Sequence, residues 1–246
     1  MTLMERRRGM MGASTIGSLK DYDVVVYTKE NYDFNKRFAS NTLYFLFNKA
    51  PTSLKSFLEG IAYPGNYTLD FSKVKFAPPQ SNYLFTQLAF AFSSTAGTST
   101  ITFIMGDNDY FNAGAKCFAS PRISGIYGAK LNVAAFSNNA QNAFFGATNL
   151  VDAEFLPNVR SLDCYFAYSD KLSDATLISL ANMLRETQST TTITLHATPK
   201  ARLASIMGRV ESVTSGEETY DRFVQDDDGS VSLQDFITTT KGWTLG

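Results

Sequence analysis

The second half of this chain contains a near-repeat, which strongly limits how the chain can fold. The octet AFFGATNL, which ends at Leu150, returns 22 residues later as YFAYSDKL, which ends at Leu172. Phe144 therefore corresponds to Phe166. A unit this short cannot bury its apolar face alone, and a period of about 20–29 residues with apolar anchors is typical of stacked repeats. The repeat predicts that residues from about 131 to 195 form successive coils that share one core, with their short strands in one parallel sheet. It also predicts a function in binding or building.

Composition sets wider limits. The 246 residues are 44% hydrophobic with a net charge of -1, which fits one large or two small domains with a substantial core. The net charge near zero gives no electric field that would attract nucleic acid. The chain has no run of 18 apolar residues, so membrane insertion is not predicted. Cys117 and Cys164 both lie in apolar surroundings and are interpreted as small buried side chains, not as a disulfide framework.

Short apolar or alternating runs, separated by Gly, Asn, Pro and Ser, predict β-strands. The segment Asp33–Ala39 fits a strand or a loop, and Ser53–Glu59 fits one or two helical turns. The predicted strands are Tyr22–Tyr27, Thr42–Phe47, Thr68–Phe71, Leu84–Phe92, Thr100–Met105, Leu131–Phe136, Leu150–Phe155 and Thr191–His196.

Two helices are predicted after the repeat. Ser173 is suited to N-cap the first, and Thr198 the second, with Pro199 at its first position where the missing N–H costs nothing. The apolar faces at helical spacing are Leu177, Leu180, Ala181 and Leu184 in the first helix, and Leu203, Ile206, Met207 and Val210 in the second.

The C-terminal segment predicts a third helix, Leu233–Thr240, with Ser232 as its N-cap and Asp235 completing a capping-box pattern. Gly242 is placed to end that helix. The last residues, Trp243–Leu245, predict a final strand or plug. A terminal unit that departs from the repeat is expected, because the open end of a stacked array must be capped.

The repeat resembles the BspA-like leucine-rich repeats of bacteria. In their pattern an aromatic residue and a leucine precede a short strand and a Pro-Asn turn, as in Phe144 to Leu150, Ala153–Phe155 and Leu156–Val159. The resemblance covers about residues 131–195 and implies a solenoid.

The predicted fold is therefore α/β: a short irregular leucine-rich-repeat solenoid with a β-rich N-terminal part and a helical C-terminal cap. The expected divisions are a docking arm (1–18), a β-rich body or degenerate repeats (19–130), the repeat region (131–198) and the cap (199–246). A β-sandwich is the main alternative.

Two further resemblances bear on function. The segment Thr238–Leu245 is similar to the closing segment of repeat proteins from gut bacteria and gut phages. The opening Glu5–Met11 resembles the start of small virion structural proteins from phages of gut Bacteroidales, including crAss-like phages. Secreted members of the repeat family carry a signal peptide, whereas the basic start of this chain has no apolar segment of 7–15 residues after it. This difference favours a virion component.

The resulting hypothesis is a non-enzymatic structural or adhesive protein of a phage virion: a head fibre, capsid decoration or tail-associated subunit that forms a homo-oligomer. The first alternative is a bacterial cell-surface adhesin that binds host protein or glycan. The second is a carbohydrate-active enzyme whose acidic residues converge only in the fold.

The N-terminal arm is expected to dock on other virion proteins. Arginine suits acidic rims and methionine adapts to apolar grooves. The proposed docking residues are Leu3, Met4, Arg6, Arg7, Arg8, Met10 and Met11.

No metal, cofactor or catalytic residue is predicted. The segment Gln225–Asp235 resembles an EF-hand loop, but Val224 would stand at its first ligand position, so an acidic turn before the Ser232 helix is favoured. His196 is the single histidine, which excludes clusters of imidazole ligands. The adjacent acids at 217–218, and those at 21 and 23, lie in loop-like or strand-edge contexts.

Tyrosines supply amphipathic surfaces that suit glycan stacking or protein contact when they are exposed. A core or rim position is the alternative for each. The candidate ligand-binding residues are Tyr63, Tyr67, Tyr83, Tyr110 and Tyr127, with Tyr165 and Tyr168 as further aromatic residues in the repeat.

Overall fold

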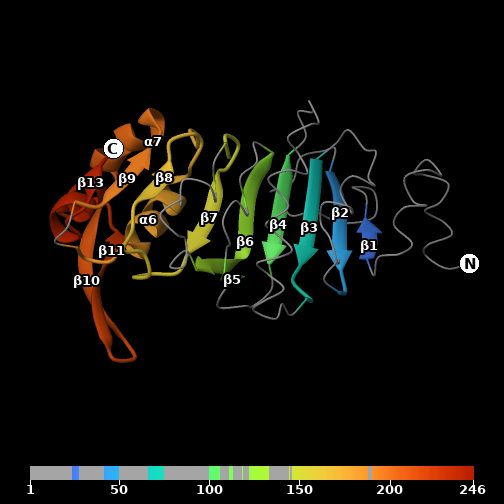
Figure 1. Ribbon diagram of the computed structural model, residues 1–246, viewed down its shortest axis with the longest axis horizontal. Helices are drawn as coiled ribbons and strands as arrows, with labels where there is room; N and C mark the ends of the chain where they lie inside the picture. Colours follow the sequence, from blue (N-terminus) through green and yellow to red (C-terminus); the bar gives the residue numbers. More distant parts are fainter. Residues whose placement is uncertain are drawn as a thin grey trace, which may run out of the picture.

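The computed structural model describes residues 24–27, 42–49, 66–74, 100–105, 111–112, 118, 122–132, 144, 146–187 and 190–246. This part of the chain is mixed α/β, with parallel and antiparallel sheets, few helices and no closed barrel. The strands succeed one another along the long axis of the molecule (Figure 1). The α/β class expected from the sequence is confirmed at this level.

The largest sheet of the described residues has seven strands in the order β1-β2-β3-β4-β6-β5, with β7 also paired to β6. All its neighbours are parallel except β1 and β2, which are antiparallel. Its strands are β1 (Val24–Tyr27), β2 (Thr42–Phe47), β3 (Asn66–Phe71), β4 (Ile101–Met105), β5 (Phe111–Asn112), β6 (Ile123–Asn132) and β7 (Asp152–Phe155).

The amino-acid pattern of β4 explains how the sheet faces the core. Ile101, Phe103 and Met105 are buried, whereas Thr102 and Ile104 between them are partly exposed. Side chains of a strand alternate between its two faces, so this period of two places one face on the interior. The predicted strands in β1–β4 and β7 are confirmed. Strand β6 begins at Ile123, before the predicted start at Leu131, and the segments 33–39, 53–59 and 84–92 lie outside the described residues.

A second parallel sheet has the order β13-β9-β8, formed by β8 (Cys164–Phe166), β9 (Thr192–Leu195) and β13 (Thr244–Leu245). The expectation that all strands of residues 131–195 lie in one parallel sheet is therefore wrong. Strand β7 pairs with β6 in the large sheet, whereas β8 and β9 pair with each other in the smaller one.

Helix α6 (Asp174–Met183) is the physical reason for this division. The hydroxyls of Thr176 and Ser179 accept hydrogen bonds from the backbone N–H groups of Ala153 (3.0 Å) and Phe155 (2.8 Å). These two residues belong to β7, so the helix covers the edge at which another strand would add. Because side chains of α6 accept hydrogen bonds from these backbone N–H groups, the sheet can end at β7 without unpaired backbone donors.

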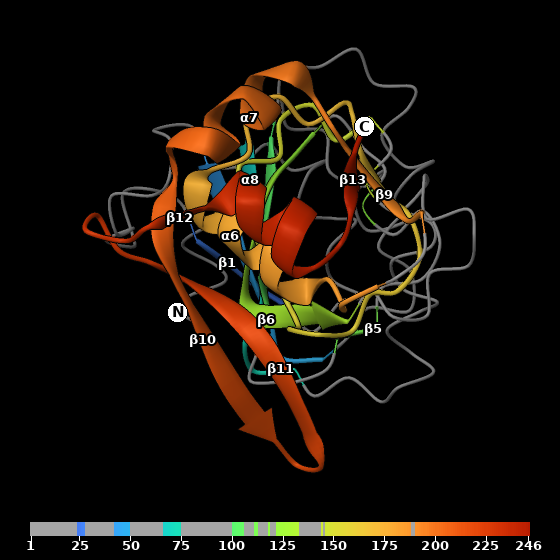
Figure 2. The same cartoon turned by 90° about the vertical axis from the view of Figure 1, so that its left-hand side faces the viewer.

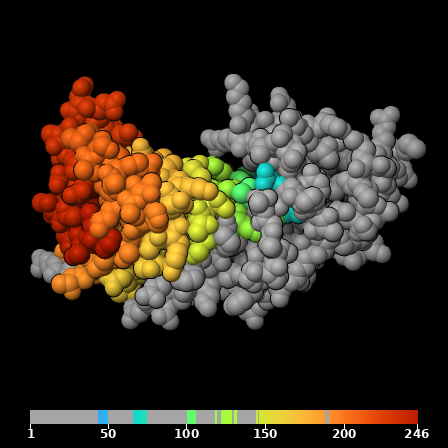
Figure 3. Space-filling model, turned by 90° about the horizontal axis from the view of Figure 1, so that it is seen from above, coloured from blue at the N-terminus to red at the C-terminus, as the bar shows by residue number. Residues whose placement is uncertain are grey.

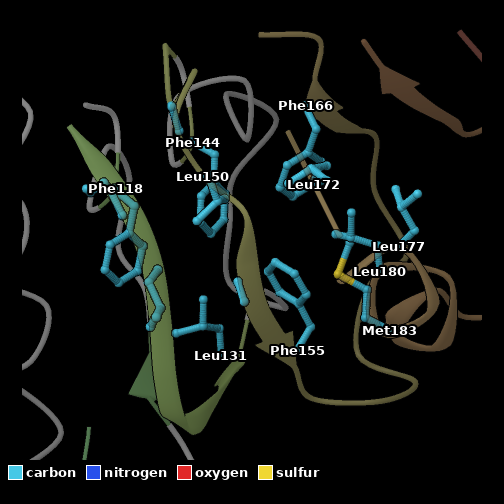
Figure 4. Packing of buried hydrophobic residues seen from close by; sticks show 14 of the residues in the cluster. Phe118, Leu131, Phe144, Leu150, Phe155, Phe166, Leu172, Leu177, Leu180 and Met183 are labelled. Carbon is cyan, nitrogen blue, oxygen red and sulfur yellow. The ribbon is translucent and has the colours of Figure 1, made fainter. Parts of the chain in front are cut away.

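The repeat region shares one aromatic core. The ring of Phe144 stacks on Phe118 at a centroid distance of 5.5 Å and on Phe166 at 5.1 Å (Figure 4). Leu150 and Leu172 are fully buried in the same cluster. The prediction that both phenylalanines and both leucines of the repeat lie in one continuous core is confirmed.

The two copies of the repeat nevertheless differ after their leucines. Strand β7 follows Leu150, whereas α6 follows Leu172. Ser173 is the N-cap of α6, and its Oγ accepts a hydrogen bond from the N–H of Thr176. The predicted apolar face of this helix is buried, so both its cap and its face are confirmed: Leu177, Leu180, Ala181 and Leu184.

The second predicted helix is shorter than expected and starts earlier. Helix α7 spans Ala197–Arg202, and its N-cap is His196, whose Nδ1 accepts a hydrogen bond from the N–H of Thr198 (3.2 Å). Thr198 is thus not the cap, and Pro199 is the third helical residue, still within the first turn where proline is tolerated. A 3₁₀ turn, η2 (Leu203–Ser205), ends the helical segment.

The helical face proposed through Met207 and Val210 is wrong, because both residues lie in a β-hairpin. Its strands are β10 (Met207–Ser215) and β11 (Glu218–Gln225), and β12 (Val231–Ser232) adds to β10. Gly216 adopts φ +62° in the connecting turn, a conformation that favours glycine. The hairpin projects away from the helices (Figure 2).

The C-terminal segment has the predicted order of helix, glycine and final strand. Helix α8 (Leu233–Asp235) starts at its N-cap Ser232 and continues as a π-helical turn, η3 (Phe236–Thr240). Gly242 follows with φ +73°, and a Cβ there would lie 2.4 Å from the carbonyl oxygen of Thr187. The Trp243 side chain is 2% exposed, and β13 comes directly after it. Residues from about 190 onward form one end of the molecule (Figure 3).

Candidate binding groove

A groove of about 950 Å³ lies where β6, β7, α6 and β11 meet. Half-buried and exposed side chains from all four elements open into it. It is lined by Ile126, Tyr127, Gly128, Lys130, Asp152, Ala153, Glu154, Phe155, Pro157, Ala175, Thr176, Ile178, Ser179, Asn182, Tyr220 and Arg222. Its volume is at the upper end of the range for sites that hold a small organic ligand.

The wall formed by the large sheet is a hydrogen-bonded network. The Tyr127 hydroxyl donates to Asp152 Oδ2 (2.7 Å), and the Ser173 hydroxyl donates to Asp152 Oδ1 (2.7 Å). Both carboxylate oxygens are therefore engaged. The network connects β6, β7 and the N-cap of α6, so it holds the tyrosine in place relative to the helix.

One ion pair lies beside that network. Lys130 Nζ is 3.5 Å from Glu154 Oε1, and both side chains are at least half exposed. An exposed pair of this kind contributes little to stability. The two groups are therefore free to reorganise around a ligand at little energetic expense.

Strand β11 forms another wall of the groove, and a side chain of α6 binds the backbone of this strand. The Asn182 side chain donates to the carbonyl oxygen of Phe223 (3.0 Å) and accepts from the N–H of the same residue (2.7 Å). Near the turn, Glu218 is 3.3 Å from the Arg185 guanidinium and accepts a hydrogen bond from the Asn158 amide. Contacts at both ends of β11 thus fix the wall that carries Tyr220 and Arg222.

Arg222 is paired on its own sheet. Its Nη2 is 2.9 Å from Glu211 Oε2, and Arg209 binds the same carboxylate. Hydrogen bonds from Arg222 and Arg209 hold the pKa of Glu211 below its usual range. The guanidinium presented to the groove is therefore already neutralised by a neighbour.

The chemistry of the groove suits binding. Asp152 is tied by two hydroxyls, and Glu154 is paired with a lysine. In the described part of the chain, no group of three or more His, Cys, Asp and Glu residues is placed to hold a metal ion. Cys164 is buried away from the groove, and desolvation raises the pKa of its thiol to about 12, which makes it a poor nucleophile.

The candidate tyrosines have different positions. Tyr127 lies in the groove. Tyr67 does not suit the ligand-binding role for which it was a candidate, and its core alternative holds. Its side chain is only 5% exposed, and its ring lies 6.1 Å from that of Phe45, because its place on β3 directs it into the core. Tyr63, Tyr83 and Tyr110 lie outside the described residues, as do the seven proposed docking residues of the N-terminal arm.

The aspartate-rich segment after β11 forms a turn, and its first aspartate, Asp226, already has partners for both carboxylate oxygens. Asp226 Oδ2 is 2.5 Å from Arg209 Nη1, and its Oδ1 accepts a hydrogen bond from the N–H of Asp228. Val224, at the first EF-hand position, belongs to β11. His196 caps α7, as described above.

Sequence reasoning missed most of the groove. Tyr220 and Arg222 stand on a hairpin that was not predicted. Thr176, Ser179 and Asn182 did carry a signal, because their spacing of three residues forms a polar stripe on α6 beside its apolar face. Each of the three forms a hydrogen bond with the backbone of a neighbouring strand.

None of the helices in the described segments is both long and apolar enough to cross a membrane. Comparisons with protein-family models, with curated proteins and with solved structures gave no match to this chain.

Proposed function

We propose that this chain is a non-enzymatic structural or adhesive protein, built as a short irregular leucine-rich-repeat solenoid that presents a binding groove. One observation supports the solenoid proposal: residues at equivalent positions of the repeat, 22 residues apart in the sequence, contact each other. Phe144 stacks on Phe166, and the Ser169 hydroxyl donates to the carbonyl oxygen of Ala147 (3.1 Å). Stacked coils bring equivalent positions together in this way.

Further support comes from strand order. Strands β2, β3, β4, β6 and β7 are parallel neighbours in the sequence in which they occur. Each coil of a solenoid adds one such strand beside the preceding one. The closing helices and the buried Trp243 fit a terminal cap.

We propose a phage virion as the setting, with the chain acting as a head fibre, capsid decoration or tail-associated subunit. The resemblance of Glu5–Met11 and Thr238–Leu245 to virion and gut repeat proteins supports it. A bacterial cell-surface adhesin is the alternative, because an open groove serves either role.

Immunogold labelling tests this setting. Antibodies raised against the recombinant chain should label purified particles released by cells that express the protein from its native genome. Labelling confined to the bacterial envelope would replace the virion by the adhesin hypothesis.

The N-terminal arm provides a second test, of assembly. Deleting residues 1–12 should leave the melting temperature of the purified protein nearly unchanged and abolish its incorporation into particles. The triple variant Arg6→Ala, Arg7→Ala, Arg8→Ala should reduce incorporation less, because the methionines remain. Normal incorporation of the truncated protein would refute the docking role.

A further inference from the structure

We infer that the groove between β6, β7, α6 and β11 binds a neutral oligosaccharide. The inference rests on the proposed binding function and names the ligand class of that site. Three properties of the described residues carry it: the charge of the lining, the state of the strand edges, and the groups that remain to contact a ligand.

The charges of the lining cancel. Lys130 and Arg222 contribute two positive charges, and Asp152 and Glu154 contribute two negative charges. Each is also engaged locally: Lys130 with Glu154, Arg222 with Glu211, and Asp152 with two hydroxyls. A phosphate, sulfate or nucleic-acid backbone needs a net positive site. A ligand without charge fits this lining better.

The strand edges beside the groove are occupied at the positions that an extended peptide would use. Peptides often add to a sheet through the free N–H and C=O groups of an edge strand. Here the N–H groups of Ala153 and Phe155 on β7 donate hydrogen bonds to side chains of α6. The N–H and C=O groups of Phe223 on β11 are both bound by the side chain of Asn182. Recognition by main-chain pairing is therefore disfavoured.

Aromatic rings and polar side chains remain to recognise a ligand. Tyr127 on β6 and Tyr220 on β11 both line the groove, and both are partly exposed. The Tyr127 ring lies against Gly125, where a Cβ would meet Cε2 at 2.6 Å, and its hydroxyl is held by Asp152. An amphipathic ring held in one orientation stacks on the apolar face of a sugar. Lys130, Glu154 and Arg222 supply donors and acceptors for its hydroxyls.

Calorimetric titration of the full-length protein with maltohexaose, cellohexaose, xylohexaose, mannohexaose and chitohexaose tests the inference. At least one should bind, with a dissociation constant that stays the same when the NaCl concentration is raised from low to high, because no charge pairing is involved. Tyr220→Ala should weaken binding about three- to tenfold, whereas Tyr220→Phe should retain it. Tyr168→Ala, an exposed tyrosine outside the groove, is the matched control.

Ala175→Trp is the second variant. Ala175 lines the groove from an exposed position on α6, so tryptophan there fills the groove without disturbing the core. Binding should be lost while the melting curve is retained. This variant keeps the test valid if Tyr220→Ala perturbs the hairpin.

The outcomes separate the ligand class from the proposed function. The inference is overturned if none of the five hexasaccharides binds, if only a heparin-derived hexasaccharide binds, or if Ala175→Trp binds as well as the wild type. Labelled particles together with any of those results would leave the virion proposal standing. Cleavage of a bound hexasaccharide, abolished in Glu154→Gln, would confirm the ligand class and refute the non-enzymatic function.

Discussion

The side-chain rings of Phe144 and Phe166 lie 5.1 Å apart between centroids and 29° from parallel, at equivalent positions of the 22-residue repeat. Phe118 continues the stack on the other side of Phe144. Phe155 also contacts both repeat phenylalanines edge-on, at 5.8 Å and 6.0 Å. Phe144 is therefore the central ring of the aromatic cluster that joins the two copies of the repeat.

Phe144→Ala should lower the free energy of unfolding by about 3–5 kcal/mol, because it removes a buried ring and leaves a cavity between two stacked neighbours. Urea unfolding followed by circular dichroism measures the change. Tyr168→Ala, at a side chain that is 42% exposed, should change stability by no more than about 0.5 kcal/mol. Equal effects of the two substitutions would show that the stack does not hold the repeats together.

Thr176→Val should lower the free energy of unfolding by about 1–3 kcal/mol, because it replaces a buried hydroxyl by a methyl group of similar size. That hydroxyl accepts from the N–H of Ala153 and donates to the carbonyl oxygen of Val151, both at 3.0 Å. Thr244→Val, at an exposed strand position, is the control. An unchanged unfolding midpoint in Thr176→Val would contradict the role of α6 in covering the β7 edge.

Lys241→Met should raise the melting temperature at neutral pH. The lysine is fully buried, and in the described part of the chain its Nζ has no hydrogen-bond partner, although it lies 5.3 Å from the Phe236 ring centroid. Burial lowers the pKa of this amine from 10.5. An unpaired buried polar group costs about 1–3 kcal/mol, which methionine removes.

The pH dependence of that effect has a defined sign. With a lowered folded-state pKa, the unfolded chain binds more protons, so the wild type gains stability as the pH rises from the folded-state pKa towards 10.5. The advantage of Lys241→Met should therefore shrink over that interval. An advantage that is constant across the interval would mean that the amine is not desolvated. Melting curves of both proteins in alkaline buffers measure it.

The Cys164 thiol should resist modification in the folded protein. Burial raises its pKa from 9.0 to about 12, and its Sγ lies 3.6 Å from the carbonyl oxygen of Leu162. In a Cys117→Ser background, Ellman's reagent at mildly alkaline pH should react only as fast as the protein unfolds. The folded state retains the proton between these pKa values, so stability should fall as the pH rises above 9.0. Rapid labelling without denaturant would refute the buried position.

Elements that depend on neighbouring residues could be predicted from the sequence. Alternation in β4, the Ser173 cap with the apolar face of α6, and the Ser232 cap with Gly242 all follow from neighbouring residues. The 22-residue offset also predicted the burial of both phenylalanines and both leucines. Each of these features depends on periodicity or capping within a short stretch of chain.

Features that depend on contacts between distant residues could not be predicted, because no local pattern encodes those contacts. Met207 and Val210 have a helical spacing, yet they join β10, where Val210 pairs with Phe223 of β11 and Met207 with Ser232 of β12. The spacing of apolar residues does not encode these strand partners. The division into two parallel sheets arises because α6 hydroxyls bind the backbone of β7, more than 20 residues earlier. The groove has the same origin: Tyr127 and Tyr220 are 93 positions apart in the sequence, and only the packing of β6 and β11 around α6 brings them into the lining of one site.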